Sequence, residues 1–414
     1  MKTLAIHFAR FGPYHLARIE AARAVLAPLG WEVIGLETGG GDATYAWREE
    51  KASQKWRRVT VFPGEAAEAI EKGRLKAGMT KALEEIKPDA VAVAGWGSAD
   101  ARACQAWCRT SGAMAIVMSE TREADGTRVW WKEWLKRRIV SRFDAGLVGT
   151  KSHREYLAKL GVPQDRVALG YNVVGNGYFA EECRKVRKSK VEGQEPARFF
   201  LASNRFIPRK NLARLIEAYA DYAKRGSSPT TAHRPPTTGL WSLCLLGDGE
   251  EREALLALCE EVKLHVEMCA PWEKEGNFEC SILNCECELP TVYFPGFRQI
   301  DELPRFYAHA GCFVHPAMEE PWGLVLNEAM ASGLPIVSGK NVGAAEELVD
   351  DGVNGWTFDA ENMDEMAECL TKVAGLDVAG WQAMADASER ILEERCPTHA
   401  FGEGLGDLLR GRFE

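Results

Sequence analysis

Short apolar segments alternate with amphipathic segments along this chain, and the alternation occurs in two successive series. The first series predicts strands at 3–9, 31–36, 59–62, 90–94, 113–118, 145–148 and 167–171, and the second at 199–202, 243–246, 292–294, 312–315 and 335–338. Segments with helical periodicity fill the gaps between them. Strands that alternate with helices are typical of parallel sheets covered by helices. The pattern therefore predicts an α/β protein with two doubly wound, Rossmann-like domains.

Changes in composition predict where the domains meet. A polar, charged stretch between 176 and 198 is typical of an interdomain connection. We therefore place an N-terminal domain at 1–180, a linker at 181–197 and a C-terminal domain at 198–376. The tail at 377–414 has a helical pattern, and we expect its helices to pack back on the first domain.

Two segments interrupt the pattern. Residues 225–239 are rich in Ser, Pro and Thr and are expected to form an inserted loop. Residues 263–290 form a second insertion that contains Cys269, Cys280, Cys285 and Cys287. Because their spacing lacks the paired Cys-x2-Cys of usual zinc sites, we interpret these cysteines as ordinary thiols in a loop and assign no metal site.

The composition excludes several classes of protein. The chain has 414 residues, 46% of them apolar, which is enough for two hydrophobic cores. A net charge of −9 argues against broad nucleic-acid binding, because a phosphate backbone requires a positive field. No stretch approaches the ~20 apolar residues that span a bilayer, and the twelve cysteines are expected to be reduced. We therefore expect a cytoplasmic protein.

A basic segment rich in tryptophan lies at 128–142. It contains three tryptophans, six basic residues and one acid. A basic amphipathic helix of this kind predicts peripheral contact with an anionic membrane, here the inner membrane face, or with a lipid-linked acceptor. The alternative is a helix whose tryptophans pack on the sheet while its cations remain solvated.

Three loops of the second domain carry residues suited to phosphate and hydroxyl groups. Ligands of open α/β sheets bind beyond the carboxyl ends of the strands, where these loops lie. The first loop carries Arg205 and Lys210, which can converge on one diphosphate. The second is a glycine turn at 247–249, which permits close approach of the backbone. The third, at 316–323, contains Glu320.

The third loop leads into a helix that begins near Gly323 and carries a second acid, Glu328. The amides of its first turn have no acceptors within the helix, and the helix dipole adds positive charge there. This helix end therefore suits a phosphate, and the two acids suit sugar hydroxyls.

These residues together resemble the retaining glycosyltransferases of family 4. Glu320 and Glu328 have the spacing of that family's Glu-x7-Glu motif, and Arg205 and Lys210 also have the family's spacing. The resemblance includes Gly247-Asp248-Gly249, Phe294-Pro295-Gly296 and Gly343-x3-Glu347, and it covers most of 198–360. It implies the GT-B fold, in which two Rossmann-like domains face a central cleft and a C-terminal helix crosses between them.

The resemblance also implies a role for each matching residue. Arg205 and Lys210 would neutralise the diphosphate of the donor, Glu328 would hold the ribose, and Glu320 would contact the transferred sugar. The remaining matching residues would approach the phosphates or border the base: Gly247, Gly296, Phe297, Gly323, Leu324 and Val325.

The first domain matches the family less closely. Gly12, after the first strand, stands where the family commonly has two glycines near the donor phosphate. Ser119-Glu120-Thr121 stands where the family often has a histidine near the sugar, so Glu120 could take that place or bind acceptor hydroxyls. The alternative for this tripeptide is a helix cap. A third departure is Asn204, where glycine usually precedes the arginine.

The predicted function is transfer of a sugar from a UDP, GDP or ADP donor to a glycan, a lipid-linked intermediate or a small metabolite, with retention, as in polysaccharide biosynthesis. No Asp-x-Asp motif is present, which agrees with the family's usual independence of metal, and no cofactor beyond the donor is expected. Two alternatives remain open: an epimerase or phosphorylase on the same architecture, and a protein that binds nucleotide sugar without turnover.

Overall fold

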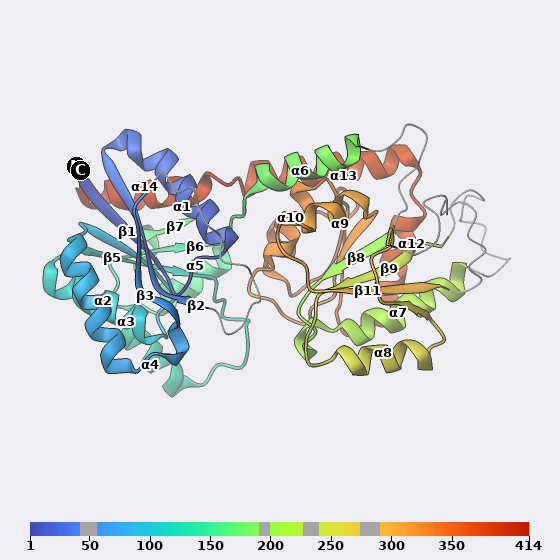
Figure 1. Ribbon diagram of the computed structural model, residues 1–414, viewed down its shortest axis with the longest axis horizontal. Helices are drawn as coiled ribbons and strands as arrows, with labels where there is room; N and C mark the ends of the chain where they lie inside the picture. Colours follow the sequence, from blue (N-terminus) through green and yellow to red (C-terminus); the bar gives the residue numbers. More distant parts are fainter. Residues whose placement is uncertain (42–55, 190–198, 227–239, 274–289, 414) are drawn as a thin grey trace. The chain divides into compact units, whose positions relative to one another are not determined.

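The computed structural model describes residues 1–41, 56–189, 199–226, 240–273 and 290–413 (Figure 1). The chain forms two compact units, one made of Met1–Gly175 with Cys396–Glu414 and the other of Asn176–Arg395. Each unit contains a seven-stranded sheet, and every strand pairing in both sheets is parallel. Two Rossmann-like units are therefore present, as the alternating pattern predicts.

The first unit has the strand order β3-β2-β1-β4-β5-β6-β7. Its strands are β1 (Lys2–Phe8), β2 (Trp31–Gly41), β3 (Arg58–Ala66), β4 (Ala90–Ala94), β5 (Met114–Ser119), β6 (Ala145–Val148) and β7 (Val167–Leu169). Its α-helices are α1 (Pro13–Leu26), α2 (Lys72–Ile86), α3 (Ala99–Ser111), α4 (Trp130–Val140), α5 (Lys151–Lys159) and α14 (Ala400–Phe413). The central strands read as continuous apolar runs, since a parallel sheet is covered by helices on both faces.

The second unit has the strand order β10-β11-β9-β8-β12-β13-β14. Its strands are β8 (Phe199–Ser203), β9 (Ser242–Leu246), β10 (His265–Glu267), β11 (Thr291–Gly296), β12 (Cys312–His315), β13 (Ile336–Gly339) and β14 (Gly355–Phe358). Its α-helices are α6 (Asn176–Lys188), α7 (Leu212–Gly226), α8 (Arg252–Glu261), α9 (Leu303–His309), α10 (Leu324–Ala331), α11 (Gly343–Leu348), α12 (Met363–Ala374) and α13 (Val378–Arg395). Phe200 of β8 pairs with both Leu243 of β9 and Cys312 of β12.

The strand order determines which loops are neighbours. In the second sheet β8 lies between β9 and β12, and in the first sheet β1 lies between β2 and β4. After each of these two strands, β8 and β1, the next strands of the chain lie toward one edge of the sheet, and the later strands lie toward the opposite edge. These switch points are the usual ligand sites of open α/β sheets. The loops that follow β8 and β12 are the two that carry Arg205, Lys210 and Glu320.

Two strands are absent from the sequence prediction. Strand β10 lies within the segment 263–290 that we interpret as an insertion, and β14 follows the last predicted strand. Both are short edge strands with mixed polarity, so neither has a long apolar run. Residues 274–289, which include Cys280, Cys285 and Cys287, lie outside the described residues, as does most of the predicted loop at 225–239.

The segment predicted as the start of the interdomain connection is helical. Helix α6 buries Phe179 and Cys183 in the second unit, where the Phe179 ring lies 5.8 Å from the Tyr307 ring and Cys183 Sγ donates to Ser332 Oγ at 3.2 Å. The unit boundary therefore falls before Asn176, because the contacts of Phe179 and Cys183 attach this otherwise charged helix to the second unit. Residues 190–198 lie outside the described residues.

The C-terminal tail is divided between the units. Helix α13 belongs to the second unit, where Trp381 Nε1 donates to Gly311 O at 2.6 Å and Ser388 Oγ donates to Leu334 O at 2.7 Å. Helix α14 belongs to the first unit and lies against α1. Only the last part of the segment 377–414 therefore packs on the first unit.

The described cysteines are free thiols, and all of them except Cys269 are buried. Burial raises the pKa of the Cys108 thiol to about 12, so it stays protonated at neutral pH. Among the helices of the described segments, none combines the length and apolar character needed to cross a membrane.

Glycines allow α14 to approach its neighbours closely. A Cβ on Gly404 would lie 2.3 Å from the carbonyl oxygen of Leu169, and one on Gly402 would lie 2.6 Å from the carbonyl oxygen of Ala21. Backbone atoms cannot move aside as a flexible side chain can. The helix therefore depends on the absence of side chains at these positions.

We predict that Gly404→Ala lowers the apparent Tm of the full chain, with a cost of about 1–3 kcal/mol from overpacking. Gly411→Ala on the same helix is the matched control, because among the described residues nothing beyond the adjacent residues and the backbone of its own helix lies within 4 Å of its Cβ position. It should be neutral or stabilising by up to about 1 kcal/mol, since alanine has the higher helix propensity. Equal Tm values for the two variants, measured by differential scanning fluorimetry, would contradict the close packing.

Candidate functional site

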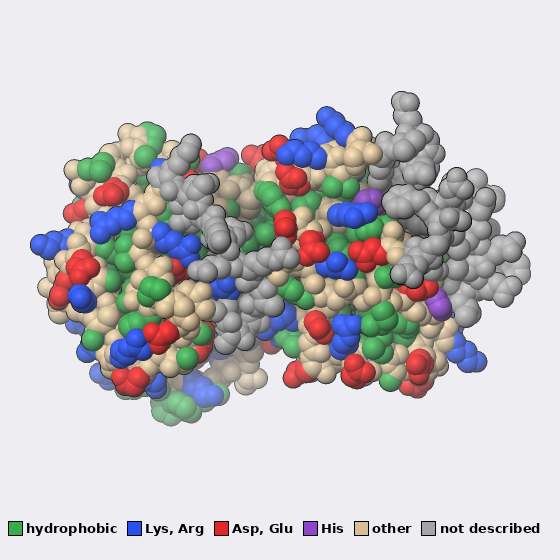
Figure 2. Space-filling model, in the orientation of Figure 1, with side chains coloured by type: hydrophobic (Ala, Val, Ile, Leu, Met, Phe, Trp, Pro, Cys, Tyr) green, Lys and Arg blue, Asp and Glu red, His purple; other side chains and the backbone are tan. Residues whose placement is uncertain are grey.

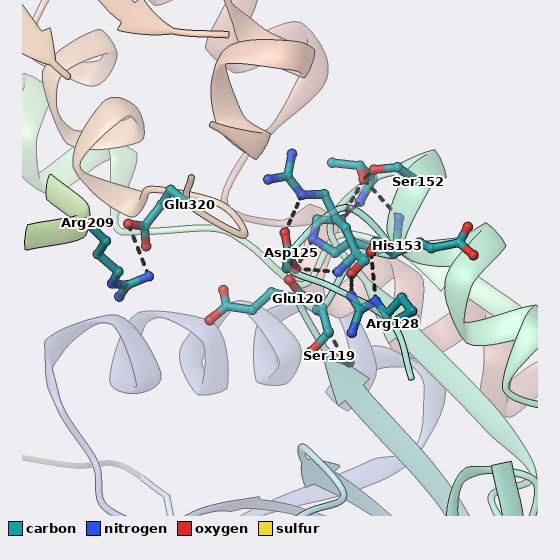
Figure 3. Close-up of polar contacts among 12 residues, drawn as sticks. Ser119, Glu120, Asp125, Arg128, Ser152, His153, Arg209 and Glu320 are labelled. Carbon is teal, nitrogen blue, oxygen red and sulfur yellow. Dashed lines mark hydrogen bonds and ion pairs between the residues drawn. The ribbon is translucent and has the colours of Figure 1, made fainter. Parts of the chain in front are cut away.

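The loops after β8 and β12 meet in the second unit. Lys210 Nζ donates a hydrogen bond to Glu320 Oε2. Arg209 Nη1 lies 3.7 Å from the same oxygen (Figure 3). The backbone joins the loops as well, because Met318 N donates to Arg209 O at 3.0 Å. Asn211 Nδ2 donates to Pro316 O at 3.1 Å. The pairing of β8 with β12 therefore brings together side chains that are far apart in the sequence.

The loop after β8 concentrates positive charge in a buried place. Lys210 is only 8% exposed. Burial lowers the pKa of its ammonium group, Glu320 opposes this change, and the charges of Arg209 and Arg205 lower the pKa further. Lys210 thus lies near two other cations, and both Lys210 and Arg209 lie within 4.0 Å of the Glu320 carboxylate. Their repulsion would be relieved by a bound anion such as a phosphate.

Helix α10 begins beside this cluster. Gly323 is its N-cap with φ of 101°, a left-handed conformation that favours glycine, and no side chain caps the helix. A Cβ at Gly323 would lie 3.1 Å from Val342 Cγ1. The first turn, with Leu324 and Val325, contains no acidic residue. This end of the helix therefore has the properties that the sequence predicts for a phosphate site.

Glu328 is almost fully buried in α10, at 1% exposure. Its Oε2 accepts a hydrogen bond of 2.7 Å from the hydroxyl of Tyr307, on α9. The tyrosine orients this carboxylate and occupies part of its accepting capacity, a contact that the sequence does not reveal. Arg209, next to Lys210, is a second residue of the site that the family motifs did not indicate, although it is a basic residue in the same loop.

The loops after β9 and β11 border the loop after β8. Gly247 has φ of 138°, and a Cβ there would lie 1.8 Å from Asn204 O. Gly247 N donates to Gly296 O at 3.1 Å. The group that approaches Gly247 is thus a backbone carbonyl of the protein itself, which is a sufficient reason for glycine at this position. Phe297 follows this junction with 37% of its surface exposed.

In the first unit, Gly12 is the N-cap of α1 in an extended conformation, with φ of −108°. Its N–H donates to His15 Nδ1 at 3.0 Å, and Phe11 N donates to the buried Glu37 at 3.0 Å. A Cβ at Gly12 would meet only His15 Nδ1, at 3.8 Å. Neither strain nor crowding within the described residues therefore requires glycine here.

Glu120 follows β5 with an exposed side chain. No helix begins at this tripeptide, since α4 starts at Trp130, so the alternative of a helix cap is wrong. Thr150 N donates to His153 Nδ1 at 3.1 Å, which leaves Nε2 to donate to Glu120 O at 2.8 Å (Figure 3). A buried histidine therefore holds the backbone at Glu120 and leaves its carboxylate at the surface.

The same loop contains a rigid ion pair. Arg122 is 5% exposed, and its Nε lies 2.9 Å from Asp125 Oδ1. Arg128 Nε donates to Glu123 O at 2.7 Å. Among the described residues, no group of three or more His, Cys, Asp and Glu could hold a metal ion.

We predict that Glu320→Gln lowers the stability of the protein by about 1–3 kcal/mol, because it leaves the buried Lys210 charge without its carboxylate. The double variant Lys210→Met with Glu320→Gln removes both charges and should recover most of the loss. Apparent Tm values of the wild type, both single variants and the double variant test the coupling. Additive losses would show that the two groups do not interact.

Comparison with solved structures shows the fold. The structure of Anabaena HepE in complex with UDP has a TM-score of 0.67 at 17% sequence identity, with 99% of this chain and 100% of that chain covered. The structure of HepE with UDP-glucose has a TM-score of 0.65 at 16% identity and the same coverage. The similarity extends over both units, and the predicted GT-B fold of two Rossmann-like domains is confirmed.

Sequence relatives match shorter parts of the chain. A sucrose synthase of Denitrovibrio acetiphilus is 36% identical over 104 residues, 24% of this chain and 13% of that protein. An uncharacterized glycosyltransferase of Methanocaldococcus jannaschii is 26% identical over 231 residues, 54% of this chain and 49% of that protein. The chain thus spans about half of the length of one relative and much less of the other. Residues 271–377, which include Glu320 and Glu328, match the family model described as "Glycosyl transferases group 1".

Proposed function

We propose that this protein is a glycosyltransferase that moves a sugar from a nucleotide-diphosphate donor to a hydroxyl acceptor. The observation that carries the proposal is the meeting of Lys210, Arg209 and Glu320 beside the uncapped start of α10. The match of 271–377 to the glycosyl transferases group 1 supports it independently. A cationic cluster beside free helix amides suits a diphosphate, and carboxylates suit sugar hydroxyls.

The geometry is suited to departure of a nucleoside diphosphate. Negative charge grows on the diphosphate as the bond to the sugar breaks, and fixed donors stabilise a transition state most where charge develops. We assign this role to Arg205 and Lys210, together with the amides of Leu324 and Val325. In this proposal Glu320 contacts the transferred sugar and Glu328 contacts the ribose.

The finer assignments extend the same proposal. We infer a family 4 enzyme that acts with retention and without a metal cofactor, in the synthesis of a glycan or glycolipid. UDP, GDP and ADP sugars are the candidate donors, and the UDP-glucose complex of HepE favours testing uridine donors first. Gly12 and Glu120 of the first unit are proposed to contact the donor phosphate and the sugar or acceptor.

We predict that one nucleoside diphosphate binds to the wild type in isothermal titration calorimetry and that the corresponding nucleotide sugar is turned over. Arg205→Ala should keep the fold and reduce turnover by about 10²–10³-fold, by analogy with the loss of one fixed donor at a developing charge. Release of nucleoside diphosphate from a panel of UDP, GDP and ADP sugars measures this effect.

Arg390→Ala is the matched control, since Arg390 is half-exposed on α13 and pairs only weakly with Glu394 at 3.3 Å. It should retain wild-type turnover. Absence of binding to all three nucleoside diphosphates would exclude the donor class. Binding without hydrolysis or transfer for any sugar would instead favour a protein that holds nucleotide sugar without turnover.

We also propose that α4 contacts an anionic membrane surface. Its large apolar side chains are exposed: Trp130 by 81%, Trp131 by 47%, Trp134 by 51% and Leu135 by 47%. Val140 is the buried residue of this helix, which argues against tryptophans that pack on the sheet. Figure 2 shows apolar side chains beside basic ones at the lower edge of the first unit, where Figure 1 draws α4.

The charges of α4 complement anionic lipid. Arg138 lies over the Trp134 ring at 4.8 Å and Lys132 over the Trp131 ring at 5.5 Å, so cations and indoles share one surface. Indole rings favour the interfacial region of a bilayer, and each nearby cation adds about 1 kcal/mol at a charged membrane.

We predict that the protein sediments with phosphatidylglycerol vesicles and not with phosphatidylcholine vesicles. Replacing Trp130, Trp131 and Trp134 together with alanine should weaken this binding by about tenfold or more without a loss of Tm, because the side chains are exposed. Val378→Ala, an exposed apolar residue of α13 with 63% exposure, is the control and should bind as the wild type does. Binding that is independent of anionic lipid would contradict the proposal.

A further inference from the structure

His315 is a buried histidine whose ring has no hydrogen-bond partner in the part of the chain that the structure describes. It is the last residue of β12 and is 0% exposed. Neither Nδ1 nor Nε2 has a partner among the described residues. Its ring is nearly parallel to that of Phe313, with centroids 6.4 Å apart. Buried polar groups are normally hydrogen-bonded, so a ring with two unsatisfied nitrogens requires an explanation.

The ring lies beside the N-terminal end of α10, where the proposed function places a phosphate. His315 Nε2 is 3.6 Å from the position that a Cβ would take on Gly323, and Glu320 Cγ is at the same distance from that position. Val342 Cγ1 lies closer still, 3.1 Å from that position. Because residue 323 is glycine, no Cβ stands between the ring nitrogen and the backbone at the start of α10. An unsatisfied ring nitrogen thus faces the start of α10, where the amides of the first turn are also without side-chain caps.

The surroundings keep the ring neutral in the free protein. Burial lowers the pKa of His315 well below its ordinary value, and the charges of Lys210 and Arg209 act in the same direction. A neutral imidazole carries one N–H donor. It can therefore donate to an anion without adding another positive charge beside Lys210 and Arg209.

We propose that His315 is a donor-binding residue whose Nε2–H donates a hydrogen bond to the distal phosphate of the nucleoside diphosphate. The proposal rests on the proposed function, because it requires a diphosphate at the start of α10. The bound phosphate supplies the partner that the ring lacks in the free protein. Lys210, by contrast, already has a hydrogen-bond partner in the free protein, the carboxylate of Glu320.

The proposal makes opposite predictions for binding and for stability. His315→Phe retains a ring on Phe313 and removes both unsatisfied nitrogens, so the apparent Tm of the free protein should stay equal or rise. The same variant should bind the nucleoside diphosphate about tenfold or more weakly, the usual worth of a hydrogen bond to a charged group. A purely structural histidine would give the reverse, a lower Tm with unchanged affinity.

Two further variants identify the nitrogen. The amide of glutamine can place an N–H near the position of Nε2, whereas the shorter asparagine amide reaches only the position of Nδ1. His315→Gln should therefore keep affinity within a few-fold of the wild type, and His315→Asn should lose it as the phenylalanine variant does. If the glutamine variant loses affinity as strongly as the phenylalanine variant, a donor role for Nε2 is overturned.

The experiment is calorimetry with UDP, GDP and ADP and with the matching monophosphates, beside thermal unfolding of each variant without ligand. The loss in His315→Phe should appear for the diphosphate and not for the monophosphate, since the contact is to the distal phosphate. Unchanged diphosphate affinity in His315→Phe overturns the inference and leaves the proposed function intact. A wild type that binds none of the diphosphates overturns both.

Discussion

The buried ion pair between Lys210 and Glu320 is the interaction on which the candidate site depends. A lysine at 8% exposure is expensive to keep charged, and the lowered pKa of Lys210 reflects this cost. Glu320 offsets part of it by accepting a hydrogen bond from Lys210 Nζ. The pair thereby holds two loops together and keeps a cation in place before any ligand binds. Preorganised charge of this kind requires no rearrangement when an anion arrives.

The parallel sheet makes this pair possible. Since β8 lies beside β12 in the strand order, their carboxyl ends are adjacent, and the loops that follow them meet. The junction with the loop after β9 depends on a glycine, because the carbonyl oxygen of Asn204 occupies the space that a Cβ on Gly247 would need. Glycine is therefore needed at the two positions of the site for different physical reasons. Gly247 is required by backbone packing, while Gly323 combines a left-handed conformation with close neighbours, since Val342 Cγ1 would lie 3.1 Å and His315 Nε2 3.6 Å from a Cβ there.

Two buried histidines of the chain differ in how their ring nitrogens are used. In the first unit, His153 donates to the backbone carbonyl of Glu120 and so holds the loop after β5. In the second unit, His315 is buried with its ring nitrogens unsatisfied among the described residues. Satisfied groups of the first kind stabilise a loop, whereas an unsatisfied group adjoining a cationic cluster is more consistent with a ligand that is absent from the free protein.

The fold class and most strands could be predicted from the sequence alone, because buried parallel strands read as apolar runs and the glycines and prolines between them mark turns. The spacing of Arg205, Lys210, Glu320 and Glu328 also made these residues candidates for the site. The sequence pattern has limits. It missed β10 and β14, whose short, mixed runs become strands only through pairing at a sheet edge. It could not show that Lys210 and Glu320 share a hydrogen bond, that Tyr307 orients Glu328, or that His315 faces the start of α10. Those facts depend on distances between residues far apart in the chain, and only the packing of strands and helices in three dimensions decides them.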